Sequence, residues 1–431
     1  MLKLLKQPLL TLLMPWLSVV MSATVFAGVI QRPQSGVLSQ SIVSIPLPTI
    51  SLTVVNSTPI GNRTPLILVH GNNEETDTRS QFGWNNYIKA FGKDSVFQSL
   101  YKVYLFTWDS EESNTFNGMA MGSMIDSLQE LQNKDVTILA HSRGGLIARY
   151  FMNLYTIKSG NHTGQLGGEK VKWLVTLATP HRGSPSADPV WVGISFDYNF
   201  PYLIESALSD IYFTDMLSPA LRSYDPKSYQ NLLWDDVDNE LTTQAVCYNS
   251  ALNSEVKECT LLQSKTSLNN LSKFNQNERY FNKIIAYGGN NFSQSLYNRI
   301  TLDILALLSQ LSTNTQKWNL AAHSVLDLFT VLMEQMPIIP PGYASVPDNP
   351  DRPFKANDGM VPLASALFLK HDASGLFQFN TNKFSYDKRL LNNFFCQVAE
   401  CNVVNETIDH LGFLDNGQLI STIMAKLDNL H

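Results

Sequence analysis

The sequence predicts an α/β protein in which a mostly parallel sheet is flanked by helices. Short apolar runs rich in β-branched residues alternate with amphipathic helical patterns, which is typical of a parallel sheet covered on both faces. The apolar run that begins at Val136 leads through a sharp turn at Ser142 into another helical pattern. The 431 residues, 44% of them hydrophobic, allow one large domain with a sizeable insertion.

Each expected element follows from its own pattern. Buried strands are predicted where apolar runs are short, and helices where apolar residues recur every three or four positions. The expected strands cover 65–69, 103–108, 136–141, 171–177 and 283–287. The expected helices cover 84–91, 119–131, 146–154 and about 419–427.

The domain organisation is less regular between these elements. Residues 51–431 are predicted to form one domain, preceded by an irregular leader at 28–50 that is rich in serine and contains prolines. Two stretches, at about 184–280 and 291–352, interrupt the alternation and are interpreted as insertions that form a helical cap or lid. The apolar helical patterns in the second stretch are equally consistent with ordinary core.

The first 27 residues have the pattern of a secretory signal peptide. Lys3 and Lys6 give a positive start, 9–20 is strongly apolar, and cleavage is expected near Ala27. An uncleaved anchor is the alternative, but the apolar stretch is short and contains proline. No later stretch is long and apolar enough for a transmembrane span, so we expect a secreted or periplasmic protein.

Charge and cysteine content agree with an extracytoplasmic protein that has no nucleic-acid partner. The net charge is −6 and no basic cluster occurs. Four cysteines suit an oxidising compartment, and the simplest pairing joins neighbours, Cys247 with Cys259 and Cys396 with Cys401. Three connectivities are possible and the sequence does not choose among them. Metal binding is a weaker alternative, because neither C-x-x-C nor paired-histidine spacing is present.

The turn at Ser142 has the features that a nucleophilic serine needs. A strand–turn–helix junction lifts the hydroxyl above the sheet, and small residues two before and two after it prevent a clash between strand and helix. Those residues are Ala140 and Gly144. The alternative is a buried serine at an ordinary strand–helix junction.

A serine nucleophile requires an acid and a base that follow it in the order serine, acid, histidine for this kind of fold. Asp358 is the acid candidate, in an Asn-Asp-Gly turn that enters an apolar segment; the alternative is a surface turn. His410 is the preferred base, because it follows a strand-like run and precedes the last helix. His371 is the competing base, and His431 lies at the chain terminus.

The expected oxyanion donors are the backbone amides of Arg143 and Asn72. Gly71 allows the backbone to pass close to the site before Asn72. His70 is expected to be structural, and His141 to pack beside the serine. The segment from Thr179 to Ser184, which contains a further histidine, is interpreted as a loop that shapes the acyl pocket or forms the cap hinge.

Together these residues resemble the bacterial triacylglycerol lipase and esterase families of the α/β-hydrolase fold. The resemblance rests on five segments in the expected order: 70–71, 140–144, 179–184, 357–359 and 409–411. It covers the sheet core from about 62 to 425, outside the leader and the insertions. It implies a serine hydrolase of carboxylic esters with Ser142, Asp358 and His410 as the triad and lipid esters as substrates.

The resemblance also bears on cofactors and partners. Several such lipases bind a structural calcium or zinc ion, but no ligands for one are identified here, so neither a metal nor a cofactor is assigned. Cap helices are expected to contact a lipid interface. The alternatives are a phospholipase, a lipid acyltransferase or a polyester depolymerase with the same triad, and, more remotely, a non-catalytic lipid-binding protein on a hydrolase scaffold.

Overall fold

The computed structural model describes the sheet core and its flanking helices. The described residues are 50–71, 79–109, 112–184, 246–247, 257–258, 270–291, 330, 356–371, 384–385 and 394–431. The predicted signal peptide, the leader up to 49 and most of both predicted insertions lie outside these residues. Within the described part of the chain, no helix is long and apolar enough to cross a membrane.

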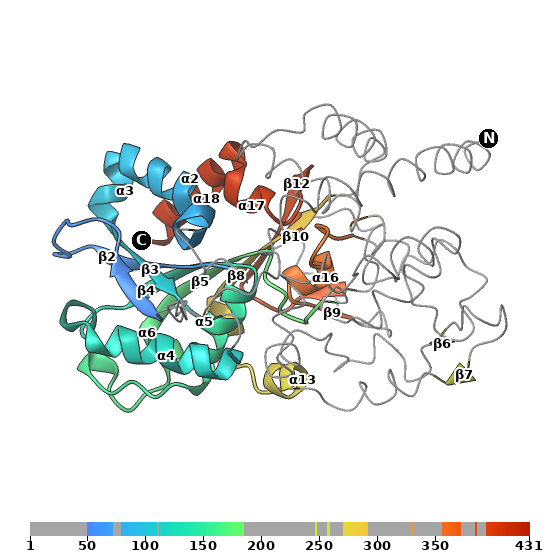
Figure 1. Cartoon of the computed structure of the whole chain (residues 1–431), viewed down its shortest axis with the longest axis horizontal. Helices are drawn as coiled ribbons and strands as arrows, with labels where there is room; N and C mark the ends of the chain where they lie inside the picture. The colour runs from blue at the N-terminus through green and yellow to red at the C-terminus, as the bar shows by residue number, and fades with distance from the viewer. Residues whose placement is uncertain are drawn as a thin grey trace, which may run out of the picture.

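An eight-stranded, mostly parallel sheet forms the centre of the protein and confirms the predicted α/β-hydrolase architecture (Figure 1). Its spatial order is β1-β3-β2-β4-β5-β8-β12-β10, and only β1 runs antiparallel to its neighbour. In this order the strands are β1 (Ser51–Val54), β3 (Tyr101–Thr107), β2 (Thr64–Val69), β4 (Val136–His141), β5 (Val171–Leu177), β8 (Ile284–Asn290), β12 (Glu400–Thr407) and β10 (Phe384–Ser385).

Helices cover both faces of the sheet (Figure 1). On β2, Leu66 and Leu68 pack on one side and Ile67 and Val69 on the other, as strand alternation requires. The first side meets α2 (Arg79–Lys93), α3 (Ser95–Leu100), α17 (Gly412–Asp415) and α18 (Gly417–Leu430). The second side meets α4 (Asn114–Ser127), α5 (Arg143–Leu154) and α16 (Leu363–Ala366).

Several smaller elements make up the rest of the described residues. They are α6 (Gly167–Lys170), α13 (Asn270–Asn275), the two-stranded sheets β9 (Leu369–His371) with β11 (Phe394–Cys396) and β6 (Val246–Cys247) with β7 (Lys257–Glu258), and 3-10 turns at Gln129–Leu131, Gly160–His162 and Phe281–Lys283. His371, the competing base candidate, is paired with Phe394 in the β9–β11 sheet.

The helix predicted at 119–131 differs from the observed one at both ends. Helix α4 begins at Asn114, where the Ser113 side chain accepts a hydrogen bond from the amide of Phe116, and it ends at Ser127 before a separate 3-10 turn. The sequence does not indicate the early start, because α4 has glycines where an apolar stripe would be expected. Its Gly122 lies against the Tyr155 ring, and a Cβ there would come within 2.3 Å of it.

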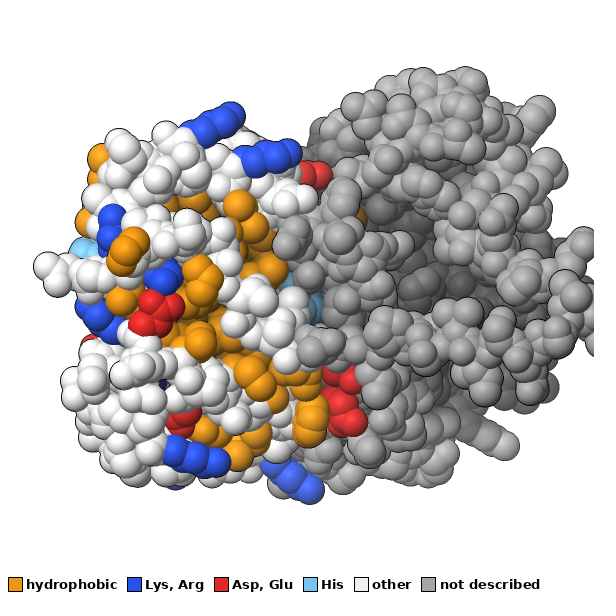
Figure 2. Space-filling model, turned by 60° about the vertical axis from the view of Figure 1, so that its left-hand side comes forward, with side chains coloured by type: hydrophobic (Ala, Val, Ile, Leu, Met, Phe, Trp, Pro, Cys, Tyr) orange, Lys and Arg blue, Asp and Glu red, His pale blue; other side chains and the backbone are white. Residues whose placement is uncertain are grey.

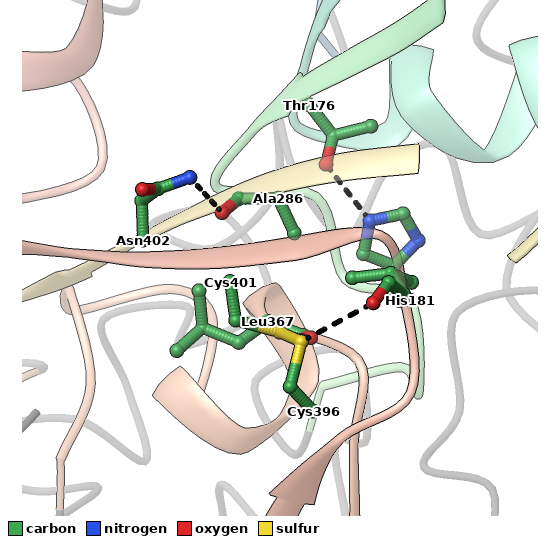
Figure 3. The surroundings of a disulfide bond; sticks show 8 residues. Thr176, His181, Ala286, Leu367, Cys396, Cys401 and Asn402 are labelled. Carbon is green, nitrogen blue, oxygen red and sulfur yellow. Dashed lines mark hydrogen bonds between the residues drawn. A yellow bond between two sulfur atoms is a disulfide. The ribbon is translucent and has the colours of Figure 1, made fainter. Parts of the chain in front are cut away.

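One of the two favoured disulfides is present. Cys396 and Cys401 are bonded, and they join β11 to β12 (Figure 3). Cys247 lies in β6, whereas Cys259 lies outside the described residues, so the Cys247–Cys259 pairing stays a prediction.

A buried ion pair connects α5 to the segment after α13. The Arg149 Nε donates to Glu278 Oε2 at 2.8 Å, and both side chains are 0% exposed. Asn153 donates to the other carboxylate oxygen, and Arg149 Nη2 donates to Asn275 Oδ1. The guanidinium also lies 4.4 Å from the Phe368 ring centroid. Because both charged groups are paired and hydrogen-bonded, these interactions offset the desolvation cost of burying them.

Glu278→Gln should therefore destabilise the protein strongly. The change leaves the Arg149 guanidinium buried without its counterion, which costs about 3–5 kcal/mol in the free energy of unfolding. Equilibrium urea unfolding would measure the loss. Asp135→Asn is the matched control, because its pair with His162 is solvent-exposed and contributes at most about 1 kcal/mol. Equal effects of the two substitutions would contradict this account.

Candidate active site

Ser142 occupies a strained turn between the central strand β4 and helix α5. Its φ of 52° and ψ of −134° lie outside the usual regions for a residue with a side chain. Its amide donates to the Leu177 carbonyl at 2.8 Å, and its carbonyl accepts from the Gly145 amide at 3.1 Å. Ser142 is partly exposed although its neighbours on both sides are buried. The turn therefore presents the hydroxyl at the end of the sheet.

The small residues around Ser142 are explained by close backbone contacts. A Cβ on Gly144 would lie 2.3 Å from the His70 carbonyl oxygen and 2.7 Å from that of Val69. Helix α5 can thus begin directly beside the end of β2 only if residue 144 is glycine. Ala140, where a glycine is more usual, is accommodated as a fully buried residue of β4.

The structure brings the three predicted triad residues together. Ser142 Oγ lies 2.9 Å from His410 Nε2, and His410 Nδ1 lies 2.9 Å from Asp358 Oδ2. Asp358 is fully buried and the His410 side chain is 9% exposed. If Nδ1 carries the imidazole proton toward the carboxylate, Nε2 is the acceptor for the serine hydroxyl.

The carboxylate of Asp358 is fixed by its own turn. Its Oδ1 accepts hydrogen bonds from the amides of Met360 at 3.0 Å and Val361 at 2.7 Å, which leaves Oδ2 for His410. Gly359 has a φ of 93°, a conformation that favours glycine and closes the turn. The Asp358 carbonyl also accepts from the His410 amide at 2.9 Å. The turn and the histidine loop are therefore linked through both backbone and side chain.

His141 is predicted to pack beside the serine, and in the structure its ring lies next to the imidazole of the base. Its Nε2 lies 3.0 Å from the His410 carbonyl oxygen, and the two imidazole centroids are 4.8 Å apart. Because that carbonyl accepts, Nε2 of His141 is the protonated nitrogen. His141 thus connects the strand before the nucleophile to the backbone of the base.

The structure describes only one of the two predicted oxyanion donors. Arg143 is the first residue of α5, so its amide lies at a helix N-terminus next to the nucleophile. Its buried side chain donates from Nε to Asn114 Oδ1 at 2.8 Å and lies 4.9 Å over the Trp108 ring. Asn72 lies outside the described residues, and its role stays a prediction.

His70 has structural contacts. Its ring stacks on Trp108 with centroids 5.1 Å apart, and its Nε2 accepts from the Trp108 amide. The Trp108 indole N–H in turn donates to the His70 carbonyl at 3.1 Å. These bonds join the ends of β2 and β3 under the site.

The loop after β5 makes contacts that the sequence did not reveal. His181 Nε2 lies 3.0 Å from Thr176 Oγ1, in the surroundings of the disulfide shown in Figure 3, and its Nδ1 lies 3.3 Å from Arg149 Nη1. Ser184 donates to the Met360 carbonyl of the acid turn at 2.5 Å. The sequence gives no signal for the hydrogen bond between Ser184 and Met360, because it joins two loops that are far apart in the chain.

Stability should depend on the protonation of His181. Burial, followed by the nearby Arg149 guanidinium, holds the pKa of His181 well below its usual range. In the unfolded chain the imidazole has a pKa of about 6.5, so below that pH the unfolded state binds a proton that the folded state does not. The free energy of unfolding is thus expected to fall as the pH drops from about 6.5.

Urea unfolding between about pH 7.5 and 5 checks this dependence. His181→Gln should flatten the slope over this window, whereas His162→Gln, at a half-buried position beside Asp135, should leave most of it. An unchanged slope in His181→Gln would mean that other groups cause the acid destabilisation.

Among the residues that the structure describes, no group of three or more His, Cys, Asp or Glu side chains is arranged to bind a metal ion.

Comparison with known protein families gives a match over part of the chain. Residues 63–190, which include Ser142, match the family model for lipase (class 2). Similar solved structures include lipase BlEst2 of Bacillus licheniformis in mature form, at 12% identity over 88% of this chain and 97% of that chain, with a TM-score of 0.39.

Two further solved structures are similar to the chain. Lipase 1 from Pelosinus fermentans is 14% identical over 86% of this chain and 100% of that chain, with a TM-score of 0.41. EstA from Clostridium botulinum is 13% identical over 89% and 91%, with a TM-score of 0.35. No curated protein matches the chain. The lipase family match over residues 63–190 and the α/β-hydrolase sheet together identify the chain as a carboxylic ester hydrolase.

Proposed function

We propose that the chain is a secreted serine hydrolase that cleaves lipid esters through Ser142, His410 and Asp358. The observation that carries the proposal is the continuous set of hydrogen bonds from Asp358 through His410 to Ser142, with 2.9 Å at each of its two steps. A serine beside a base that is oriented by a carboxylate is the arrangement that activates a hydroxyl as a nucleophile.

The mechanism follows from these positions. His410 accepts the hydroxyl proton as Ser142 Oγ attacks the ester carbonyl, and Asp358 stabilises the imidazolium that forms. The amides of Arg143 and Asn72 stabilise the oxyanion, each donor contributing about 3–4 kcal/mol to lowering the barrier. His410 then protonates the leaving alcohol, and a water activated by the same base releases the acid from the acyl-enzyme.

Secretion is supported by the Cys396–Cys401 disulfide, because such bonds persist in oxidising compartments. It agrees with the signal peptide predicted at residues 1–27.

A lipid substrate is supported by apolar side chains on α4, which begins beside Arg143. Phe116 and Met119 lie one helical turn apart and are 48% and 41% exposed. Figure 2 shows hydrophobic side chains gathered across the described face of the core. We propose that Phe116 and Met119 contact the lipid surface during attack on aggregated substrate, in addition to the predicted cap helices.

The nucleophile is tested with a chain-length series of p-nitrophenyl esters, comparing the mature protein with Ser142→Ala. The kcat is expected to fall by at least about 10⁴-fold in the variant, because the hydroxyl that forms the acyl-enzyme is absent. The chain-length profile distinguishes an esterase from a lipase. A Ser142→Ala variant as active as the wild type would refute the proposal and favour the non-catalytic lipid-binding alternative.

The contact surface on α4 is tested with the double variant Phe116→Ser, Met119→Ser. Hydrolysis of emulsified long-chain esters should fall several-fold, while hydrolysis of a soluble short-chain ester stays unchanged, because only the former requires contact with a lipid surface. Val96→Ser is the control, since Val96 is 59% exposed on α3, which packs on the opposite face of the sheet. An equal loss on both substrates would exclude an interfacial role.

The alternatives with the same triad differ in substrate or acceptor. Phospholipid and polyester substrates in the same assay test for a phospholipase and a polyester depolymerase. Product analysis with and without an added alcohol tests for an acyltransferase, which would yield a new ester in place of the free acid.

A further inference from the structure

We propose that Ser184 is a positioning residue for the catalytic acid, acting through the peptide that joins Met360 to Val361. The inference rests on the proposed function, because it assumes that Asp358 is the acid of the triad. From the sequence alone, the loop that carries Ser184 is expected only to shape the acyl pocket or to form the cap hinge.

The Met360–Val361 peptide is held at both ends. Its N–H, from Val361, donates to Asp358 Oδ1 at 2.7 Å. Its C=O, from Met360, accepts from Ser184 Oγ at 2.5 Å. The N–H and C=O of a trans peptide point in opposite directions, so fixing the oxygen also fixes the direction of the N–H. Ser184 therefore orients the donor that holds the carboxylate.

The bonds form one continuous series from Ser184 to the nucleophile. The hydroxyl of Ser184 polarises the Met360–Val361 peptide, and that peptide donates to one oxygen of Asp358. The other oxygen lies 2.9 Å from His410 Nδ1, and His410 Nε2 lies 2.9 Å from Ser142 Oγ. Hydrogen bonds in series strengthen one another where water is excluded, and Ser184 is only 5% exposed.

The loop that carries Ser184 is itself fixed to the segment after the acid turn. Ser365 accepts from the Arg182 amide at 3.0 Å and donates to the Gly183 carbonyl at 2.6 Å. The Arg182 guanidinium donates to the Leu369 carbonyl at 2.8 Å. Ser184 is thus held in register with the acid turn by the bonds of the two residues that precede it.

Removal of the Ser184 hydroxyl should affect the base rather than substrate binding. The Met360–Val361 peptide then loses one of the two hydrogen bonds that fix its orientation, and the carboxylate is oriented less well toward His410. A less well-oriented carboxylate stabilises the imidazolium less, so the pKa of His410 falls. The rate falls as well, because the same imidazolium forms in the transition state.

The test compares Ser184→Ala and Ser184→Thr with the wild type by steady-state kinetics across pH on a soluble ester. In Ser184→Ala we expect kcat to fall about tenfold with little change in KM, and the acidic limb of kcat/KM to move to lower pH. Ser184→Thr retains a hydroxyl and should restore most of both properties.

Ser159→Ala is the matched control. Its hydroxyl donates to Asp126 in a part-buried site remote from the triad, so its loss should lower stability without moving the pH profile. The inference is overturned if Ser184→Ala keeps the wild-type kcat and acidic limb, or if it behaves as Ser159→Ala does. Activity remaining in Ser142→Ala would instead refute the proposed function, which keeps the two failures distinct.

Discussion

The position of Ser142 at the end of β4 is the constraint on which the site depends. A residue with φ of 52° costs of the order of 1–3 kcal/mol, and the surroundings must supply that energy. They do so through the Leu177 carbonyl, which holds the Ser142 amide, and through Gly144, which lets α5 start against the end of β2. Both contacts require β4 to lie between β2 and β5 in a parallel sheet. The strand order of the sheet is therefore a condition for the strained conformation of the nucleophile.

Two buried histidines of this core show how neighbours decide chemistry. His181 contacts the Arg149 guanidinium and the Thr176 hydroxyl, so burial and a like charge lower its pKa and keep it neutral. His410 contacts the Asp358 carboxylate, an arrangement that favours a positive imidazole during reaction. The sequence around His181 is similar to a catalytic motif, but the contacts of His181 with Arg149 and Thr176 indicate a structural role. Residue type alone does not separate these roles.

The sequence was informative where local chemistry determines structure. Apolar runs predicted five strands of the sheet, and the small residues beside Ser142, the Asn-Asp-Gly turn and the placement of His410 predicted three side chains that the fold brings within hydrogen-bond distance. It was uninformative where partners are distant backbone groups. Neither the Ser184 bond to Met360 nor the early start of α4, where glycines pack on α5, has a periodic signal.

The contacts of Ser184 also bear on how the core tolerates long intervening segments. The loop that ends at Ser184 and the turn that begins at residue 356 each border a stretch outside the described residues. Bonds between them, from Ser184 to Met360 and from Ser365 to Gly183, join these two described segments directly to each other. Loop length costs little free energy once its ends are fixed. The position of Asp358 is therefore set by contacts within the described core, and the same contacts fix the spacing of acid, base and nucleophile.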